Sequence, residues 1–270
     1  MAELITLYTG KNTDTWPSPS IWADCPVNSA QEVGDTIHIF ENFGHGASGL
    51  LLGGDTPPVF PTVGSATGTT SAVGGILKVA TAAVLNGGSM VSTQTQFTKV
   101  STVAADSRKV WFECRLRYNA SLADVGVFVG LSGTIIETEI IADGGALAAV
   151  ANNSNLIGFF AQTHASAPTF ATVTKNGVAA TLTVEAIAAT PVVDTFIKLG
   201  LKYDPSEDPA EKISFYVNGT RRTAFVTEAQ MQGASFSQTA IYGGLLLAKT
   251  NAVAIKTVDV DWVRCASDRV

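Results

Sequence analysis

Three acidic side chains in the segment ETEIIAD come nearest to a catalytic pair in this sequence. They are Glu137, Glu139 and Asp143. Retaining glycoside hydrolysis needs two carboxyl groups about 5–5.5 Å apart, one protonated and one ionised. No tryptophan-rich surface for a sugar flanks these three residues, so we favour a solvated strand face or loop. We therefore expect no catalytic residues and no enzymatic activity.

The histidines and a second acidic segment are the candidates for a metal site. His38, His45 and His164 are scattered, without the close spacing of histidine ligands or a nearby cysteine. The acidic loop at 204–211 could bind Ca²⁺, which takes several oxygen ligands. A hairpin loop whose carboxylates serve solubility is the alternative that we favour, so no metal and no cofactor are expected. The carboxylates of this loop are Asp204, Glu207, Asp208 and Glu211.

One tryptophan is a candidate for contact with a glycan. Trp111 falls on the polar side of its predicted strand, beside Arg115. An aromatic ring with an apolar body and a polar edge suits stacking on a sugar, and Asn152, Asn153 and Asn155 crowd one loop. The ring could equally be covered by the N-terminal part of the chain or by a neighbouring subunit, and we favour the covered arrangement.

The elements that must position these residues are β-strands. Segments 197–203 and 213–217 alternate apolar and polar residues, which predicts strands with one face in a core. The acidic loop joins them, and Asn218-Gly219 predicts a type I′ turn into a third strand. One helical turn is predicted at 226–232. The sequence therefore predicts an all-β antiparallel sandwich, with further strands at 37–43, 76–81, 89–100, 110–118, 125–131, 135–141, 156–162, 170–175, 178–187, 241–249 and 254–265.

Composition limits the partners that this chain can have. The net charge of −6 argues against a nucleic-acid partner, and no run of about 18 apolar residues predicts a membrane helix. The first residues lack the pattern of a signal peptide, so we expect no secretion by that route. Cys25, Cys114 and Cys265 are few and odd in number, which favours a reducing compartment. The sequence leaves open whether Cys25 and Cys265 meet.

Two irregular regions are the candidates for contact with partners. Residues 1–36 lack a strand pattern and are predicted to form an N-terminal arm that precedes a sandwich domain over 37–270. The arm is expected to dock on its own sandwich or on a neighbouring subunit. A loop rich in Gly and Pro at 44–75 is expected to be functional or a flexible spacer. The candidate partner-binding residues of arm and loop are Trp16, Pro17, Pro19, Trp22, Leu50, Leu51 and Phe60.

The order of the segments resembles that of concanavalin A-like lectin/glucanase (LamG-like) jelly rolls, and in particular a family of tailed-bacteriophage virion proteins with that fold. An N-terminal IWADCPV segment at 21–27 and an acidic-aromatic strand at 40–43 match that family, as does the closing Trp262 to Cys265. Glycosidases of this fold carry a Glu-x-Asp-x-x-Glu motif, which ETEIIAD does not match. The resemblance covers roughly residues 20–266, with the segments VWFECRLR, VFVGLSG, LIGFF, FIKLGLKYD, KISFYVNGT and VDVDWVRC.

This resemblance implies a structural protein of the virion, with a concanavalin A-like jelly-roll β-sandwich. It implies a decoration or cement protein on the outer surface of the capsid, assembled in the host cytoplasm and bound to the major capsid protein. It also implies a homo-oligomer, a trimer being one form, with neither nucleic acid nor membrane as partner. A lectin-like virion protein that binds carbohydrate for host adhesion is the first alternative, and a glycoside hydrolase is the second.

Overall fold

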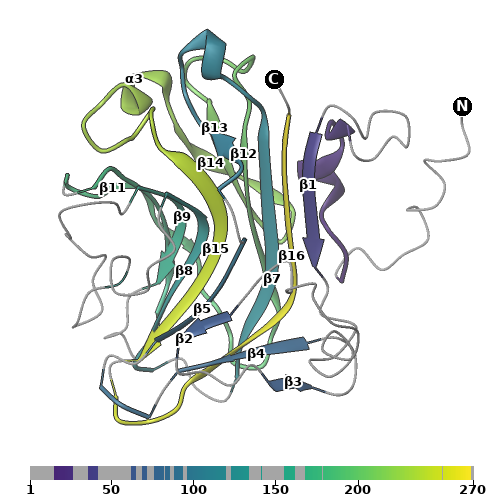
Figure 1. The fold of residues 1–270 in the computed structure, drawn as a ribbon, viewed down its shortest axis with the longest axis vertical. Coiled ribbons are helices and arrows are strands. Elements are labelled where there is room, and N and C mark those ends of the chain that lie inside the picture. The colour runs from purple at the N-terminus through teal and green to yellow at the C-terminus, as the bar shows by residue number, and fades with distance from the viewer. Residues whose placement is uncertain are drawn as a thin grey trace, which may run out of the picture.

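Two antiparallel β-sheets face each other in the computed structural model of this chain (Figure 1). The first, sheet A, has the strand order β14-β13-β12-β7-β16-β4-β3, and β1 pairs with β16 beside β4. The second, sheet B, has the order β11-β10-β9-β8-β15-β5-β2, and β6 also pairs with β15. The structure describes residues 15–26, 36–41, 62–64, 69–71, 76–81, 83–85, 88–93, 96–119, 123–133, 141, 155–161, 168–177, 179–250 and 252–268.

The strands of sheet A come from both halves of the chain. The last strand in the sequence, β16, lies between β7 on one side and both β4 and β1 on the other. The strands are β1 (Thr36–Glu41), β3 (Thr69–Ser71), β4 (Ile76–Ala80), β7 (Val110–Asn119), β12 (Ile197–Tyr203), β13 (Ile213–Val217), β14 (Thr220–Val226) and β16 (Thr257–Asp268).

Sheet B is built around β15, which pairs with β8 along one edge and with β5 and β6 along the other. Its strands are β2 (Thr62–Gly64), β5 (Gly88–Ser92), β6 (Thr98–Lys99), β8 (Val125–Ser132), β9 (Leu156–Ala161), β10 (Phe170–Lys175), β11 (Leu182–Ala189) and β15 (Ile241–Thr250).

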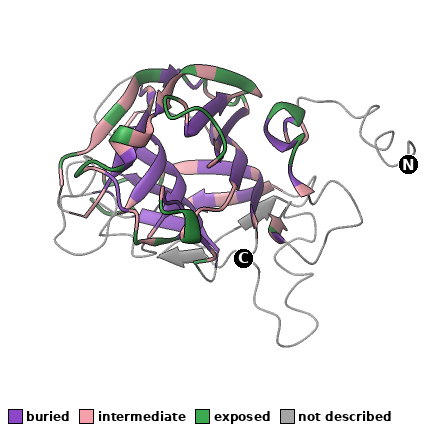
Figure 2. Ribbon diagram, turned by 90° about the horizontal axis from the view of Figure 1, so that it is seen from above, coloured by how far each residue is buried: buried purple, intermediate pink, exposed green. Residues whose placement is uncertain are grey.

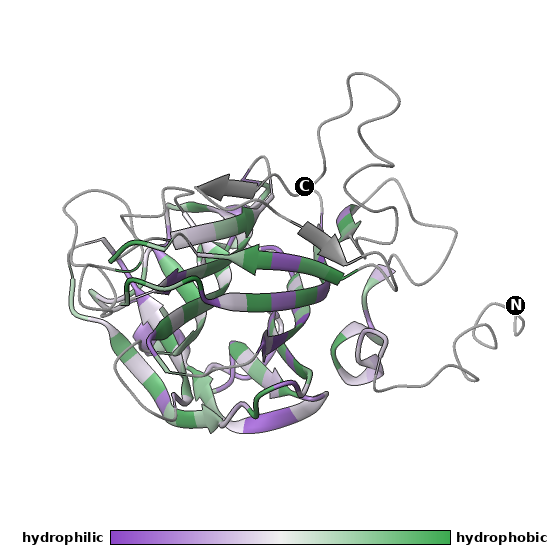
Figure 3. Cartoon of the chain, turned by 90° about the horizontal axis from the view of Figure 1, so that it is seen from below, coloured by the Kyte–Doolittle hydropathy of each residue, from purple (hydrophilic) through white to green (hydrophobic). Residues whose placement is uncertain are grey.

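The main hydrophobic core lies between the two sheets. Along β7 and β12 of sheet A, every second side chain points into this core, and apolar and polar residues alternate along the strands (Figure 3). On β7, Phe112 and Cys114 point into this core and are fully buried. Buried positions are concentrated in the facing strands of the sandwich (Figure 2). Alternation along 110–118 predicts this core position for Cys114, and the structure confirms it.

Alternation and turn residues correctly predicted two strands of sheet A, β12 and β13, and the turn from β13 into β14. Strands β12 and β13 have the predicted bounds. Asn218 and Gly219 both have positive φ, 50° and 77°, as a type I′ turn requires. The predicted helical turn is α3 (Glu228–Met231), which begins with a capping box between Thr227 and Gln230.

Some predicted boundaries were wrong or lie outside the described residues. The single strand predicted at 89–100 is two strands, β5 and β6, which pair with different parts of β15. The strand predicted at 178–187 begins later, at Leu182. The strand predicted at 135–141 lies outside the described residues except for Ile141. Within the predicted loop at 44–75, β2 and β3 extend the edges of the two sheets.

The remaining helical elements are short. They are α1 (Pro19–Trp22), which lies within the predicted arm, and the 3-10 turn η3 (Ala104–Asp106). None of the helices in the described part of the chain is long and apolar enough to cross a membrane.

Candidate functional site

Residues 15–26, called the N-terminal segment below, lie on the outer face of sheet A. There, α1 is on the opposite side of this sheet from sheet B (Figure 1). Because side chains alternate along a strand, the residues between the core positions of β7, β12 and β16 point to this outer face. We call the set that contacts the N-terminal segment the docking face. It comprises Lys109, Trp111, Glu113, Lys198, Gly200, Lys202, Tyr216, Gly219, Trp262, Arg264 and Ala266.

Glu113 lies at the centre of the docking face and is completely buried. Its Oε2 accepts hydrogen bonds from the backbone N–H of Ser18 and from Nε1–H of Trp22, both at 2.8 Å. Burial raises the pKa of Glu113, while donors from Ser18 and Trp22 and the charge of Lys198 oppose that rise. A buried carboxylate is costly unless its oxygens are paired. The segment that covers Glu113 supplies two donors to Oε2, while Oε1 has no hydrogen-bond partner among the described residues.

Two backbone carbonyls of the N-terminal segment accept hydrogen bonds from the docking face. Nε1–H of Trp262 donates to the carbonyl of Thr15 at 2.8 Å, and Nζ of Lys198 donates to the carbonyl of Trp16 at 3.2 Å. The sheet therefore binds the backbone of the segment as well as its side chains.

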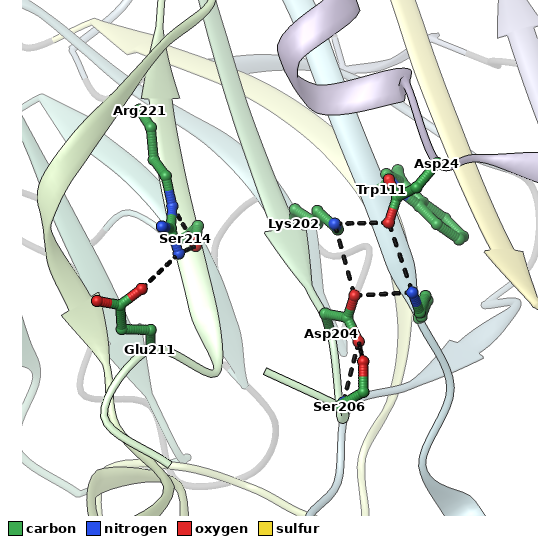
Figure 4. Close-up of polar contacts among 9 residues, drawn as sticks. Asp24, Trp111, Lys202, Asp204, Ser206, Glu211, Ser214 and Arg221 are labelled. Carbon is green, nitrogen blue, oxygen red and sulfur yellow. Dashed lines mark hydrogen bonds and ion pairs between the residues drawn. The ribbon is translucent and has the colours of Figure 1, made fainter. Parts of the chain in front are cut away.

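A cluster of alternating charges holds the end of the segment (Figure 4). Asp24 lies 2.6 Å from Nζ of Lys202 and 3.5 Å from Nζ of Lys109, and it accepts a hydrogen bond from Nε1–H of Trp111 at 3.1 Å. Asp204 bridges the same two lysines, at 2.8 Å from Lys109 and 3.5 Å from Lys202. Although burial alone would raise the pKa of Asp24, hydrogen bonds from Lys202 and Trp111 lower it.

A small apolar cluster completes the contact and is separate from the main core. It contains Ile21, Trp22 and Cys25 of the segment together with Trp111, Tyr216 and Ala266 of sheet A. A Cβ on Gly200 would lie 2.5 Å from Cδ1 of Ile21, so the missing side chain makes room for the isoleucine. The guanidinium of Arg264 stacks over the ring of Trp22, with Cζ 3.9 Å from its centroid.

This arrangement decides between two interpretations of Trp111. Its side chain is 0% exposed and lies under the N-terminal segment, so it cannot stack on a glycan in this structure. The predicted glycan contact at Trp111 is therefore wrong, and the covered arrangement, with the chain's own N-terminal part as the cover, is confirmed.

The predicted partner contacts of the arm are only partly compatible with the structure. Trp22 is 2% exposed and packs on the sandwich of its own chain, and its contact with a partner stays a prediction. Trp16 and Pro17 are half-buried and Pro19 is exposed. The loop candidates Leu50, Leu51 and Phe60 lie outside the described residues, as do Glu137, Glu139, Asp143, His45, His164, Asn152 and Asn153.

The acidic loop uses its carboxylates in separate interactions. Asp204 faces two lysines, whereas Glu211 forms an ion pair with Arg221 at 2.9 Å (Figure 4). Nζ of Lys212 donates to two backbone carbonyls of the same loop, those of Pro205 and Glu207. Over the described ranges of the chain, no cluster of three or more His, Cys, Asp or Glu residues could hold a metal ion.

His38, the remaining metal candidate, lies on β1 at the edge of the docking face. Nε–H of Arg264 donates to Nε2 of His38 at 3.0 Å. Partial burial of the ring and the charge of Arg264 lower the pKa of His38 to about 4. The imidazole is therefore neutral at pH 7 and accepts a hydrogen bond from a cation.

The outer face of sheet B is apolar where the structure describes it. Nζ of Lys249 donates to the carbonyl of Ile141 at 2.7 Å and so ties the connection between β8 and β9 to this face. The buried residues of this cluster are Met90, Phe128, Ile141, Leu156, Phe160, Val173, Leu245 and Leu247.

Sequence reasoning missed most of the docking face. Glu113, Lys198 and Lys202 were predicted to be solvent-facing because they are the polar partners in alternating strands. One signal was available: Trp111 and Glu113 share a strand face, and an outward tryptophan beside a carboxylate indicates a covered surface. No pattern in the strands identifies which segment covers it.

Comparisons with known proteins were made for both sequence and structure. No protein-family model matches the sequence, and no curated protein matches it. Among solved structures, the winged bean acidic lectin complexed with methyl-α-D-galactose has a TM-score of 0.55 at 12% identity over 87% of this chain and 99% of that chain. Peanut lectin has a TM-score of 0.53 at 13% identity over 86% and 97%.

A protein of unknown function from Shewanella oneidensis MR-1, SO2946, has a TM-score of 0.53 at 9% identity over 87% of both chains. Sequence identities this low carry the fold and nothing more. The two curved antiparallel sheets, their order and these matches together show that the chain has the concanavalin A-like jelly-roll fold, as the sequence predicted.

Proposed function

We propose that this protein is a structural component of a bacteriophage virion, a decoration or cement protein that binds the outer head surface and acts without catalysis. The docking face of sheet A is the observation that carries the proposal. There, a buried carboxylate, three lysines and two indole N–H groups bind the backbone and side chains of a short segment. A surface that recognises a chain segment in this way suits a protein whose work is assembly.

The placement on a virion is supported by the order of the segments from VWFECRLR to VDVDWVRC, which resembles that of phage virion proteins. The net charge of −6 agrees with a position on the outer surface of the virion, because it limits association between particles. Many weak contacts repeated on a lattice would add through effective concentration.

Binding to purified heads tests this proposal. Heads that lack the protein are mixed with the wild-type chain, separated by density-gradient sedimentation and heated. We expect binding that saturates at a fixed copy number, and a rise in the temperature at which the heads release DNA. Absence of the protein from purified particles, or release of reducing ends from a polysaccharide by the purified chain, would contradict the proposal.

Glycan binding is a second candidate, favoured by the solved structures that share this fold, two of which are named lectins. Trp111 is not available for it, so the sugar would have to bind elsewhere on the molecule. A glycan array probed with the wild-type chain tests this candidate. Retention of the protein by particular sugars, with release by the free sugar, would support it, and an array without signal would remove it.

A further inference from the structure

We propose that the docking face is an exchange site between copies of this chain, where the N-terminal segment of one copy replaces that of another. The partner is thus a second copy of the same protein. This inference deepens the proposed structural function by naming one of its partners. It is tested on purified chains, so it can fail while binding to heads succeeds.

The hydrophobic core between the two sheets is complete without the N-terminal segment. The main core between the sheets contains no residue of the segment, whose buried apolar side chains all belong to the separate cluster outside sheet A. Removing the segment therefore opens no gap between the sheets. A segment that adds to a finished core can leave one copy and join another at low cost.

The second argument is that the docking face recognises the segment by specific chemistry. Glu113 accepts from the backbone of Ser18 and the indole of Trp22, and Gly200 leaves the space that Ile21 fills. Asp24 meets two lysines. Each of these contacts joins the segment to residues of the sheet, so the same contacts form whether the segment comes from the same chain or from another.

The third argument concerns reach and local concentration. Nine positions separate Pro26 from Thr36, where β1 begins, and nine extended residues span at most about 30 Å. A tether of that length holds its own segment near the face at an effective concentration of about 1 mM. We therefore expect a free monomer at micromolar concentration. Exchange becomes competitive where copies are crowded on a surface.

A charge-reversal experiment separates exchange from docking within one chain. Asp24→Lys adds a third cation beside Lys109 and Lys202, so this variant repels its own segment. Lys202→Glu adds a carboxylate beside Asp24 and Asp204, so this variant also repels its own segment. In a mixture, the segment of the Asp24→Lys variant is attracted electrostatically to the docking face of the Lys202→Glu variant. The unaltered segment of the Lys202→Glu variant is likewise attracted to the unaltered docking face of the Asp24→Lys variant.

Light scattering after size-exclusion chromatography gives the result. We expect each variant alone to remain at the 28.1 kDa of one chain and the equimolar mixture to reach twice that mass. A mixture that stays at the mass of one chain would overturn the exchange. Because a single variant could fail to fold, both are also co-expressed with different tags. Joint purification supports the proposal, and purification of each tag alone contradicts it.

Two controls match these variants in charge. Asp24→Lys combined with Lys202→Glu in one chain restores the attraction within that chain, so this double variant should be monomeric and should not pair with either single variant. Asp208→Lys makes the same charge change at an exposed position of the acidic loop, away from the docking face. It should be monomeric both alone and mixed with Lys202→Glu. A dimer in either control would mean that the charge at Asp24 does not direct the pairing.

Discussion

Glu113 shows how a single buried carboxylate can organise a surface. It lies on a strand of sheet A and is paired through one oxygen with two N–H donors from a segment about 90 residues earlier in the chain. Charge-assisted hydrogen bonds of this kind are stronger than neutral ones. Both donors lose their acceptor together when the carboxylate is removed.

Glu113→Ala is expected to release the N-terminal segment and to lower the free energy of unfolding by about 2–4 kcal/mol, because two buried donors lose their partner. Urea denaturation measures the loss, and a red shift of tryptophan fluorescence reports exposure of Trp22 and Trp111. Glu113→Gln is the control: its amide oxygen can still accept a hydrogen bond, so it should lose less than half as much. Equal stability of wild type and the alanine variant would show that the carboxylate does not hold the segment.

Asp204 gives the molecule a stability that depends on pH. Burial alone would raise the pKa of this carboxyl, but hydrogen bonds from Lys109 and Ser206 outweigh it and hold the pKa at about 2, below the ordinary 3.8. A group with a lowered pKa in the folded state stabilises the protein above its ordinary pKa, and this contribution is lost as the pH falls towards 2.

We therefore expect wild type to exceed Asp204→Asn in unfolding free energy by at most about 2 kcal/mol at pH 7, with the difference shrinking between pH 4 and pH 2. Chemical denaturation at several pH values measures this. A difference that stays constant over that range would mean that ionisation of Asp204 is not its source.

At this scale the sequence predicted residue environments well where the rule was alternation. Cys114 is in the core as expected. Trp111 was placed on the correct face of its strand, and the N-terminal part of the chain or a neighbouring subunit was expected to cover it. Alternation states which way a side chain points, and it contains no information on what lies above it.

Among the elements, the β8–β9 pair is the most sensitive to a change of side chain. Gly130 and Gly158 lie opposite each other in the register. A Cβ on Gly158 would lie 2.2 Å from the carbonyl oxygen of Val129 and 2.8 Å from Cα of Gly130. Neither neighbour is the end of a flexible side chain, so the two strands would have to separate.

Gly158→Ala is therefore expected to cost about 3 kcal/mol or more, because overpacking forces a backbone shift. Gly177→Ala is the matched control. It has a positive φ of 51° with nothing within 4 Å, so it should cost only about 1 kcal/mol of left-handed backbone strain. Thermal denaturation of both variants measures the difference. Similar midpoints for the two would contradict the close approach of β8 and β9.

The strands β12 and β13 and the Asn-Gly turn from β13 into β14 were predicted correctly, because alternation and turn residues are local signals. The division of 89–100 into β5 and β6 was not predicted. Both strands pair with β15, so the division depends on a partner more than 140 positions later in the sequence. Local sequence patterns contain no information about so distant a partner strand.

For the whole molecule, the three cysteines answer a question that the sequence left open. Cys25 belongs to the N-terminal segment and packs on the outer face of sheet A, whereas Cys265 packs between the sheets, so the two lie on opposite faces of sheet A. All three cysteines are free and buried. Burial also raises the pKa of the Cys265 thiol, which keeps it protonated and unreactive.

Addition of a reductant is therefore expected to leave the midpoint of thermal denaturation unchanged, whereas loss of a native disulfide typically costs about 2–5 kcal/mol. Calorimetry with and without reductant measures this, and mass spectrometry under both conditions should show the mass of three thiols. A lower midpoint after reduction would mean that a disulfide forms in solution.

The all-β class could be predicted from alternation and composition, while the jelly-roll order of the strands came only from the resemblance of whole segments. Periodicity cannot predict that β7 pairs with β16, because the sequence of neither strand identifies its partner. The long-range pairs that create the docking face, such as Thr15 with Trp262, are hidden for the same reason.

The central position of β16 has a consequence for how the protein is made. This strand has the latest position in the sequence of all the described strands, yet it is flanked on both sides within sheet A. Synthesis proceeds at about 5–20 residues per second, so sheet A cannot be completed until β16 has been synthesised. The N-terminal tryptophans emerge from the ribosome first, and the indole that binds the carbonyl of Thr15 follows 247 residues later. The nascent chain therefore carries an uncovered aromatic segment for many seconds, when a chaperone or a sister chain can reach it.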